Sequence, residues 1–130
     1  CIRDRDDRAF RTELMRKTDR LYLVLRRNDW LVAFIGCSLN DHTKDCHITN
    51  VAVAPNFQNH GLGYFLVTTI IKKARQLEYA KVTLEVRVSN TRAQKLYRDI
   101  GFVDNGIKKD YYFNDREDAL NMVLDITKIG

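Results

Sequence analysis

The spacing of apolar positions changes several times along the chain, and each spacing predicts a different element. Residues 81–88 alternate strictly between apolar and polar side chains, which is typical of a half-buried β-strand. Residues 62–77 instead repeat apolar side chains every three or four positions and carry basic residues near the end of the run, which predicts an amphipathic helix on a sheet. The chain therefore combines strand and helix patterns.

Shorter apolar runs predict the remaining elements. Two runs on either side of the polar turn at residues 27–29 form a β-hairpin signature. Phe10, Leu14 and Met15 are spaced for one buried helical stripe, so we interpret the residues through about Lys17 as a helix. In chain order, the expected elements are a helix through about residue 17, strands at 21–25, 30–37 and 47–54, a helix at 62–77, a strand at 81–88, a helix that Asn90 caps and that ends near residues 99–101, and strands at 102–113 and 118–126.

This order predicts an α/β fold with a mostly antiparallel, mixed central sheet of about six to seven strands, flanked by helices. The sequence has no repeat, linker or low-complexity segment, so we expect a single domain over residues 1–130. A chain of this length buries roughly two-thirds of its unfolded surface, so its core requires no metal or disulfide.

Composition narrows the compartment and the class of partner. The three cysteines are an odd number without C-x-x-C spacing, which favours reduced thiols in the cytoplasm over a secreted disulfide framework. No apolar stretch approaches the roughly 20 residues of a membrane span, and the charged start has no signal-peptide pattern. The net charge of +5 comes from interleaved charges, which favours an ordinary solvated surface over a nucleic-acid patch. We expect a soluble cytoplasmic protein with no membrane or direct nucleic-acid contact.

The junction between the strand at 47–54 and the helix at 62–77 carries the most informative motif, Gln58-Asn59-His60-Gly61-Leu62-Gly63. Its two glycines let the backbone approach a ligand closely, and the free N–H groups and dipole of a helix start favour a phosphate or pyrophosphate. The spacing differs from the G-x-G-x-x-G dinucleotide motif and from the P-loop, which has Lys and Ser/Thr after its last glycine. The junction therefore predicts a phosphorylated cofactor of another kind.

Gln-x-x-Gly-x-Gly at residues 58–63 resembles the acetyl-CoA pyrophosphate loop of the GNAT superfamily of N-acetyltransferases. The resemblance runs from about residue 8 to residue 126 and implies the GNAT fold, with acetyl-CoA as cofactor. Members of this family begin with another strand and helix, whereas this chain begins at Cys1, so we expect that portion to be absent or only partly present. The further motifs, which resemble the ribosomal-protein-alanine N-acetyltransferase branch, are residues 84–90, Ala93, Leu96-Tyr97, residues 100–102, Tyr111-Tyr112 and residues 116–119.

The resemblance also implies which residues bind acetyl-CoA. The backbone N–H groups of residues 58–63 would hold the pyrophosphate, and the backbone of Val51 and Val53 would pair with the pantetheine arm as a false strand. Many relatives bend this strand with a bulge and splay it from its neighbour, and we expect the same here. Asn90 would hydrogen-bond the pantetheine amides, although as a helix cap it needs no ligand. The expected cofactor residues are Val51, Ala52, Val53, Gln58, Asn59, His60, Gly61, Leu62, Gly63, Asn90, Ala93 and Tyr97.

Acetyl transfer to an amine needs a base for the amine proton and an acid for the leaving thiolate. The strand at 47–54 contains no carboxylate. Glu85, on the next predicted strand, stands where the resembled branch has its catalytic glutamate and is the expected base. The structural alternative for Glu85 is a surface ion pair with Arg87 two residues on.

Three tyrosines complete the expected site. Tyr97 shares one helical face with Asn90 and Ala93 and is the expected acid, with a half-buried core aromatic as its alternative. Tyr111 and Tyr112 resemble the branch's tyrosines that gate or hydrogen-bond the acceptor N-terminus. Their alternative is a strand filled with β-forming residues.

Cysteines and histidines offer two further chemistries that we weigh and set aside. Cys37 lies in an apolar run and is expected to be a small buried apolar residue, since an acyl-carrying cysteine needs an adjacent base. His42, Cys46 and His47 are crowded but match no standard zinc spacing, so no metal site is expected.

These residues predict direct transfer of an acetyl group from acetyl-CoA to the N-terminal α-amine of a protein, by resemblance the alanine of a ribosomal protein. An α-amine has an ordinary pKa near 8, so it asks less of a carboxylate base than a lysine near 10.4. The alternatives are the same chemistry on a lysine side chain or a small amine, and a non-catalytic acyl-CoA-binding or ribosome-associated module. A nucleic-acid-binding function, which would show steep salt dependence, ranks last.

Overall fold

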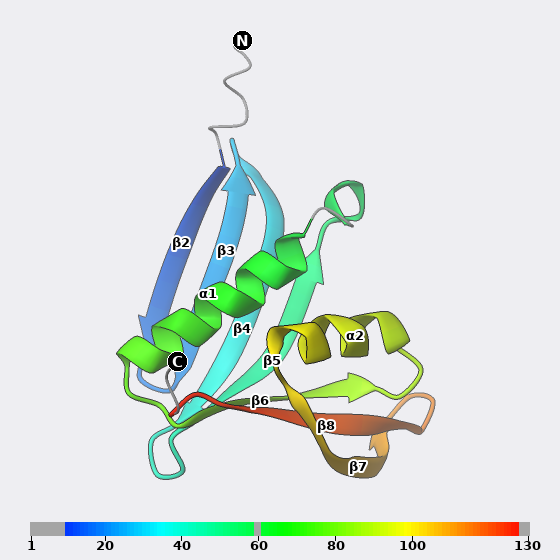
Figure 1. Cartoon of the computed structure of the whole chain (residues 1–130). Coiled ribbons are helices and arrows are strands. Elements are labelled where there is room, and N and C mark those ends of the chain that lie inside the picture. The colour runs from blue at the N-terminus through cyan, green and yellow to red at the C-terminus, as the bar shows by residue number, and fades with distance from the viewer. Residues whose placement is uncertain (1–9, 59–60, 128–130) are drawn as a thin grey trace.

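One mixed sheet organises the part of the chain that the computed structural model describes, residues 10–58 and 61–127. The described strands lie in the order β2-β3-β4-β5-β6-β8-β7, and β5 with β6 is the one parallel pair among these seven strands (Figure 1). The predicted α/β fold with a mostly antiparallel, mixed sheet is confirmed. The elements are β2 (Phe10–Lys17), β3 (Arg20–Arg27), β4 (Trp30–Asn40), β5 (Asp45–Val53), the short 3-10 helix η2 (Pro55–Phe57), α1 (Leu62–Gln76), β6 (Lys81–Arg87), α2 (Thr91–Ile100), β7 (Val103–Tyr112) and β8 (Glu117–Asp125).

The helix predicted at the start of the chain is wrong where the structure describes it, because residues 10–17 form the strand β2. Phe10 and Leu14 are four residues apart, a separation that places two side chains on one face of a strand as well as of a helix. Pairing with β3 decides between the two, since Leu14 lies opposite Leu23 in an unbroken antiparallel ladder. Residues 1–9 of the predicted helix lie outside the described residues.

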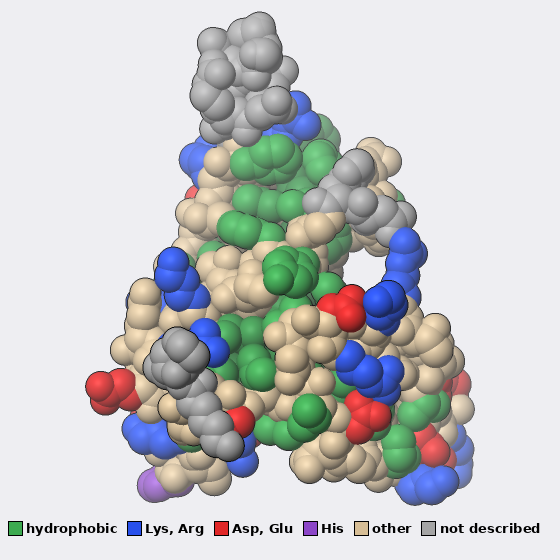
Figure 2. All heavy atoms as spheres, in the orientation of Figure 1, with side chains coloured by type: hydrophobic (Ala, Val, Ile, Leu, Met, Phe, Trp, Pro, Cys, Tyr) green, Lys and Arg blue, Asp and Glu red, His purple; other side chains and the backbone are tan. Residues whose placement is uncertain are grey.

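The core lies between α1 and the face of the sheet that it crosses (Figure 1). Leu66 and Ile70 of α1 are completely buried, as are alternate residues of the strands beneath, such as Leu21 and Ile35. Figure 2 shows further hydrophobic side chains gathered over β2–β4 beyond the end of α1. In the described part of the chain, no helix is long and apolar enough to cross a membrane.

The centre of the sheet opens where β5 and β6 stop pairing. Their parallel ladder covers only residues 45–48 with residues 81–84. A bulge in β5 lies at the same point, because Cys37 of β4 pairs with Ile48 while its neighbour Gly36 pairs with Asn50. Beyond it β5 continues with β4 and β6 continues with β8. The predicted bulge and splay are therefore both present.

Candidate active site

A cavity of about 430 Å³ lies where β5 and β6 separate. Its walls come from the outer half of β5, the loop that follows, the first turn of α1 and one face of α2. The described residues of the sequence motif, Gln58 and residues 61–63, thus lie beside a hollow that can hold a ligand. The predicted cofactor residues that line it are Val51, Val53, Gln58, Gly61, Leu62, Gly63, Asn90, Ala93 and Tyr97.

The other predicted cofactor residues do not line this cavity in the described structure. Ala52 is exposed and pairs with Phe34 of β4, because alternation along the strand turns its side chain away from the cavity that Val51 and Val53 line. Asn59 and His60 lie outside the described residues.

The outer half of β5 presents backbone amide groups to the cavity. Ala54 N donates to Val32 O at 2.7 Å, so the hydrogen-bonding groups of every second residue here turn toward β4. Those of Val51 and Val53 turn the other way, to the side where β6 no longer pairs. Gln58 Nε2 donates to Val53 O at 3.1 Å. Apart from Val53 O, which Gln58 occupies, this side of Val51 and Val53 has no partner strand in the described sheet, so the edge suits an extended ligand containing amides.

The first turn of α1 offers donors for an anion. Gly61 caps the helix with φ 76° and ψ 10°, a conformation that glycine adopts without the strain of a side chain. This turn has no side-chain cap and no acidic residue, so its first N–H groups and the helix dipole are not neutralised within the described helix. Gly63 lets α2 approach closely, since a Cβ there would lie 3.4 Å from Leu96 Cδ2.

A second cavity, of about 210 Å³, adjoins the first. Both are lined by Val51, Asn90, Ala93 and Tyr97, so they meet at this face of α2. The remaining wall of the second cavity includes Glu85. A ligand in the first cavity and a different ligand in the second can therefore touch near Tyr97.

Glu85 is a buried carboxylate with polar partners on both oxygens, and its side chain is 5% exposed. Oε1 lies 2.8 Å from His47 Nε2 and accepts a hydrogen bond from the Tyr111 hydroxyl at 3.3 Å. Oε2 lies 2.8 Å from Lys108 Nζ and accepts a hydrogen bond from Asn121 Nδ2 at 2.8 Å. The partners come from β5, β7 and β8, the strands that surround Glu85 in β6.

These partners keep Glu85 ionised. Burial raises the pKa of the carboxyl group, but the hydrogen bond from Lys108, the charge of His47 and the hydrogen bond from Asn121 outweigh burial, so the pKa lies below its ordinary value. Glu85 is therefore a strong counter-ion for a cationic ligand and a weak base.

Tyr97 lies on the inner face of α2 and is 9% exposed. Its ring packs edge-on against Phe102 at 5.8 Å between centroids. Burial, with a smaller contribution from the Tyr112 hydroxyl, raises the pKa of Tyr97 above its ordinary value. The phenol therefore keeps its proton, which suits a general acid, and the ring also has the packing role named as its alternative.

The two predicted acceptor tyrosines have different surroundings. The Tyr111 hydroxyl donates to Glu85, while Tyr112 lines the second cavity and lies under the Arg87 guanidinium, 4.0 Å from its ring centroid. Both belong to the same end of β7, where Tyr111 reaches Glu85 and Tyr112 lines the cavity beside it.

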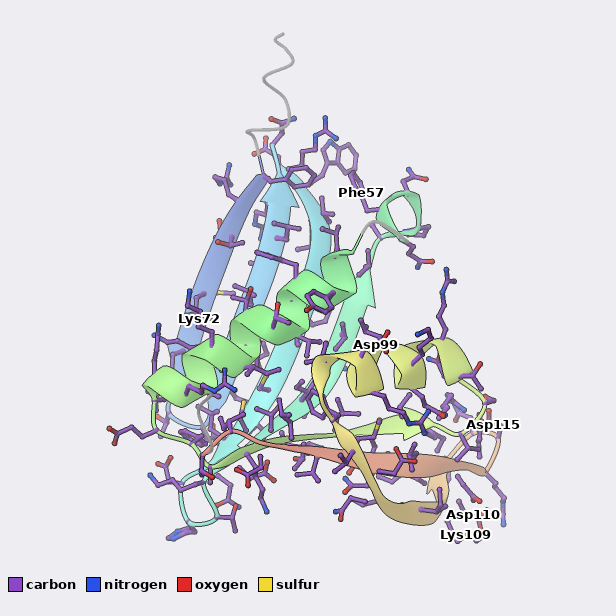
Figure 3. The ribbon with its side chains drawn as sticks, in the orientation of Figure 1. Phe57, Lys72, Asp99, Lys109, Asp110 and Asp115 are labelled. Atoms are coloured by element: carbon purple, nitrogen blue, oxygen red, sulfur yellow. The ribbon has the colours of Figure 1, made fainter. Side chains whose placement is uncertain are left out.

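The structural alternative for Glu85, an ion pair with Arg87, is wrong. Arg87 Nη1 lies 2.8 Å from Asp115 Oδ2 and 3.0 Å from Glu117 Oε1. Asp115, labelled in Figure 3, belongs to the turn between β7 and β8 and draws Arg87 away from Glu85.

Sequence reasoning missed three residues of this site, His47, Lys108 and Asn121. None belongs to a motif, and each reaches Glu85 from another strand. Strict alternation does place Glu85 away from the apolar side of β6, but its neighbours follow from the strand order β5-β6-β8-β7, which the sequence pattern does not contain.

The cysteines and histidines that suggested other chemistry have separate surroundings. Cys37 and Cys46 are buried free thiols, and a hydrogen bond with Cys46 together with burial raises the pKa of Cys37, which disfavours a nucleophilic thiolate. His47 contacts Glu85, whereas His42 lies in the exposed turn after β4. Among the described side chains, no group of histidine, cysteine and acidic residues is arranged to hold a metal ion.

Known proteins resemble this chain in both sequence and structure. The sequence matches the model of the Acetyltransferase (GNAT) family over residues 2–102. A putative ribosomal protein bS18-alanine N-acetyltransferase of Bacillus subtilis (strain 168) is 33% identical over 120 residues, which cover 92% of this chain and 78% of that relative. The ribosomal protein bS18-alanine N-acetyltransferase of Escherichia coli (strain K12) is 40% identical over 80 residues, 60% of this chain and 54% of that relative, so the match spans about half of the latter.

The structural comparison agrees with the sequence comparison. The crystal structure of the ribosomal-protein-S18-alanine N-acetyltransferase from Escherichia coli matches with a TM-score of 0.79 and 32% sequence identity, covering 88% of this chain and 74% of that one.

Proposed function

The chain belongs to the acetyltransferase (GNAT) family, and from this premise we propose that it transfers the acetyl group of acetyl-CoA to the N-terminal α-amine of a protein within one ternary complex. The observation that carries the proposal is the meeting of two cavities at Tyr97, with Glu85 in the wall of the second. The relatives named for the alanine of ribosomal protein bS18 support the same kind of acceptor here.

The first cavity fits the chemistry of acetyl-CoA. The uncapped first turn of α1 suits the pyrophosphate, and the strand edge at Val51 and at the Val53 N–H, which has no partner strand, suits the two amides of the pantetheine arm. A ligand that uses both features extends from Gly61 toward Tyr97, which lies where the two cavities meet. Bound acetyl-CoA would supply the thioester whose acetyl carbon the acceptor amine attacks.

Glu85 would bind the acceptor as an ammonium and, after that group has lost its first proton to water, take the proton that the nitrogen releases as the C–N bond forms. Its carboxylate already has an ammonium group at 2.8 Å, that of Lys108, so the geometry for an ammonium is present. Since an α-amine has an ordinary pKa near 8, roughly a tenth of it is neutral at pH 7 before any base acts. A weak carboxylate base, acting directly or through a water molecule, is then sufficient to receive the second proton released when the C–N bond forms.

Tyr97 would supply the proton for the leaving group. As the amine nitrogen bonds to the acetyl carbon, the C–S bond breaks and the sulfur carries the electron pair. Tyr97 lines both cavities, and burial keeps its phenol protonated, which supports it as the donor to that sulfur. Proton transfer from Tyr97 and proton uptake by Glu85 balance over one turnover.

A lysine side chain is the second candidate acceptor, and Lys108 is the observation that favours it. The Lys108 ammonium shows that a primary amine on a long aliphatic stem can reach Glu85. A lysine acceptor has an ordinary pKa near 10.4, so far less of it is neutral at pH 7 and the weak base Glu85 would have more to do.

The test is acetyl-CoA turnover, followed by thiol release, with two matched peptides. One has a free alanine N-terminus and no lysine, and the other has the same sequence with a blocked N-terminus and one internal lysine. We expect release with the first peptide and background release with the second. Release with the lysine peptide alone would replace the N-terminal acceptor with a lysine, and CoA binding without release from either would favour a binding module.

A further inference from the structure

Three side chains outside the proposed catalytic pair form a hydrogen-bonded chain that ends on Glu85. Glu85 Oε1 lies 2.8 Å from His47 Nε2, and His47 Nδ1 lies 2.6 Å from Thr83 Oγ1. Thr83 Oγ1 in turn donates to Asp45 Oδ1 at 2.8 Å. The chain forms because His47 lies directly beside Thr83 in the short parallel ladder of β5 and β6.

The direction of these hydrogen bonds fixes where the protons are. An ionised carboxylate only accepts, so Glu85 takes the proton of His47 Nε2 and Asp45 takes the hydroxyl proton of Thr83. Thr83 has one hydroxyl proton, so toward His47 Nδ1 it accepts, and Nδ1 must donate. Both ring nitrogens then carry a proton, and the ring is an imidazolium. A neutral ring with Nδ1 bare would turn the Thr83 hydroxyl toward Nδ1 and leave the 2.8 Å contact between Thr83 and Asp45 without a proton.

We propose that Asp45 and Thr83 hold His47 as an imidazolium against Glu85, and that His47 is thereby a positioning residue that sets how readily Glu85 accepts a proton. The inference rests on the proposed function, in which Glu85 is the base. It assigns a role to a histidine that lies in no motif of the chain.

Other charged and polar groups face these hydrogen-bonded side chains from every neighbouring strand. Lys108 and Tyr111 of β7 contact Glu85, and Asn121 of β8 donates to it. On the β4 side, Ser38 is the register neighbour of His47 and accepts a hydrogen bond from the Arg20 guanidinium at 3.0 Å.

His47 therefore lies between two carboxylates, with guanidinium and ammonium groups further out. Both ring nitrogens already have an acceptor, Glu85 Oε1 and Thr83 Oγ1, so the Thr83 hydroxyl is the group that can turn when the ring loses a proton.

This arrangement makes the basicity of Glu85 depend on the charge of His47, and therefore on pH. While His47 is charged, Glu85 has a cation on each oxygen and gives up a proton easily. When His47 loses its proton, one of these cations disappears and Glu85 becomes a stronger base. The His47 side chain is 28% exposed, so its proton can exchange with solvent while Glu85 stays buried.

The first experiment measures the protonation state of the His47 ring directly and does not depend on turnover. Nitrogen-15 chemical shifts of the histidine rings distinguish an imidazolium from either neutral tautomer, and His47→Gln identifies the His47 signals. We expect both ring nitrogens of His47 to carry a proton in the folded wild type near neutral pH, and we expect Asp45→Asn and Thr83→Val to shift the His47 nitrogen signals toward those of a neutral tautomer. A neutral ring in the wild type, or signals that neither substitution moves, overturns the proposal.

The second experiment reads the effect on Glu85. His47→Gln keeps an N–H donor for Oε1 but removes the charge, so we expect the carboxyl carbon-13 titration of Glu85 to move up by about one pH unit. His42→Gln is the matched control and should leave this titration unchanged. An unchanged Glu85 titration in His47→Gln overturns the proposal even if turnover is normal, while absence of turnover in the wild type would overturn the proposed function and leave the ring measurement valid.

Discussion

At the scale of single residues, the chemistry of Glu85 depends on which side chains reach its two oxygens. Lys108 and Asn121 contact Oε2, and His47 and Tyr111 contact Oε1. In the proposed mechanism, the acceptor ammonium would share this shell or displace Lys108 from it. Binding of the acceptor would then exchange one cation for another on the ionised carboxylate.

Replacing Glu85 by Gln tests whether this carboxylate carries turnover. We expect kcat at pH 7 to fall by about 100-fold or more, since a general base contributes about 10² to 10⁴. Affinity for CoA should stay unchanged, because Glu85 lines the second cavity and not the first. Steady-state kinetics and CoA titration measure both, with the exposed Glu78→Gln as control. Normal turnover in Glu85→Gln would remove the assigned base.

Tyr97→Phe separates the acid from the packing role of the ring. The substitution keeps the edge-on contact with Phe102 and removes the hydroxyl, so the melting temperature should change little. We expect kcat to fall by about 100-fold with a peptide acceptor while KM for acetyl-CoA stays within about twofold. A full loss of kcat together with a lower melting temperature would show instead that Tyr97 acts through structure.

The pH dependence follows from the two shifted groups. The pKa of Glu85 lies below its ordinary 4.5, so the carboxylate is present at every pH above that and is lost only as the pH falls through the lowered value. The pKa of Tyr97 lies above its ordinary 10.0, so the phenol proton is lost only at higher pH. Between these limits we expect kcat/KM to rise with pH through about 8 as the free acceptor amine loses its proton. A profile that is already level at pH 6 would contradict this assignment.

At the scale of elements, the first turn of α1 both starts the helix and, in the proposed function, binds the pyrophosphate. One added negative charge should affect these two roles in opposite directions. Tyr64 is exposed in that turn and lines the first cavity. Tyr64→Glu should stabilise the helix by about 0.3–1 kcal/mol, because an acidic group complements the N-terminal dipole. The same charge should weaken CoA binding by about tenfold through repulsion of the pyrophosphate. Thermal unfolding should show a higher melting temperature and CoA titration a lower affinity, with Tyr64→Phe as control. Unchanged CoA affinity would mean that the pyrophosphate binds elsewhere.

Elements also show how far the sequence predicts the fold. Alternation in residues 81–88 identified β6, and Asn90 caps α2 as expected, its side chain accepting a hydrogen bond from Ala93 N at 3.1 Å. Residues 10–17 were misassigned because a four-residue spacing fits both periods and only the partner strand β3 decides between them.

The parts of the candidate site that come from residues close together in the sequence were predictable. The parts that bring together residues far apart in the sequence were not. The glycine motif before α1 and the face of α2 are local features of the sequence, which a motif and helical spacing reveal. The surroundings of Glu85 are not local, because His47 and Asn121 lie 38 and 36 positions away in the sequence and meet Glu85 only through the strand order.

At the scale of the whole molecule, two antiparallel groups of strands share one short parallel ladder. β2–β5 form one group and β6, β8 and β7 the other, and only residues 45–48 with 81–84 connect their ladders in the described sheet. The two cavities lie beside the part of β5 and β6 that no longer pairs. The gap between β5 and β6 therefore results from where their backbone pairing ends, and not from small side chains at this point.

Hydrogen exchange tests this arrangement across the molecule. The amides of β3 and β4 lie inside paired ladders and should be well protected, whereas those of Val51 and Val53 face the opening and should exchange quickly without ligand. Addition of CoA should slow exchange at Val51 and Val53 by tenfold or more and leave β3 unchanged. Equal protection of Val51 with and without CoA would rule out the false-strand mode of binding.

The short ladder between β5 and β6 also sets the order in which the protein gains its activity as it is synthesised. Neighbouring hairpins such as β3–β4 pair between segments close in sequence, and such local contacts form faster than distant ones. The β5–β6 ladder must wait for α1 to be made, and the hydrogen bond from Asn121 to Glu85 must wait for β8. A nascent chain stopped before β8 would hold paired hairpins without the proposed acceptor site, so the capacity for acetyl transfer would arise with the last of these strands to leave the ribosome.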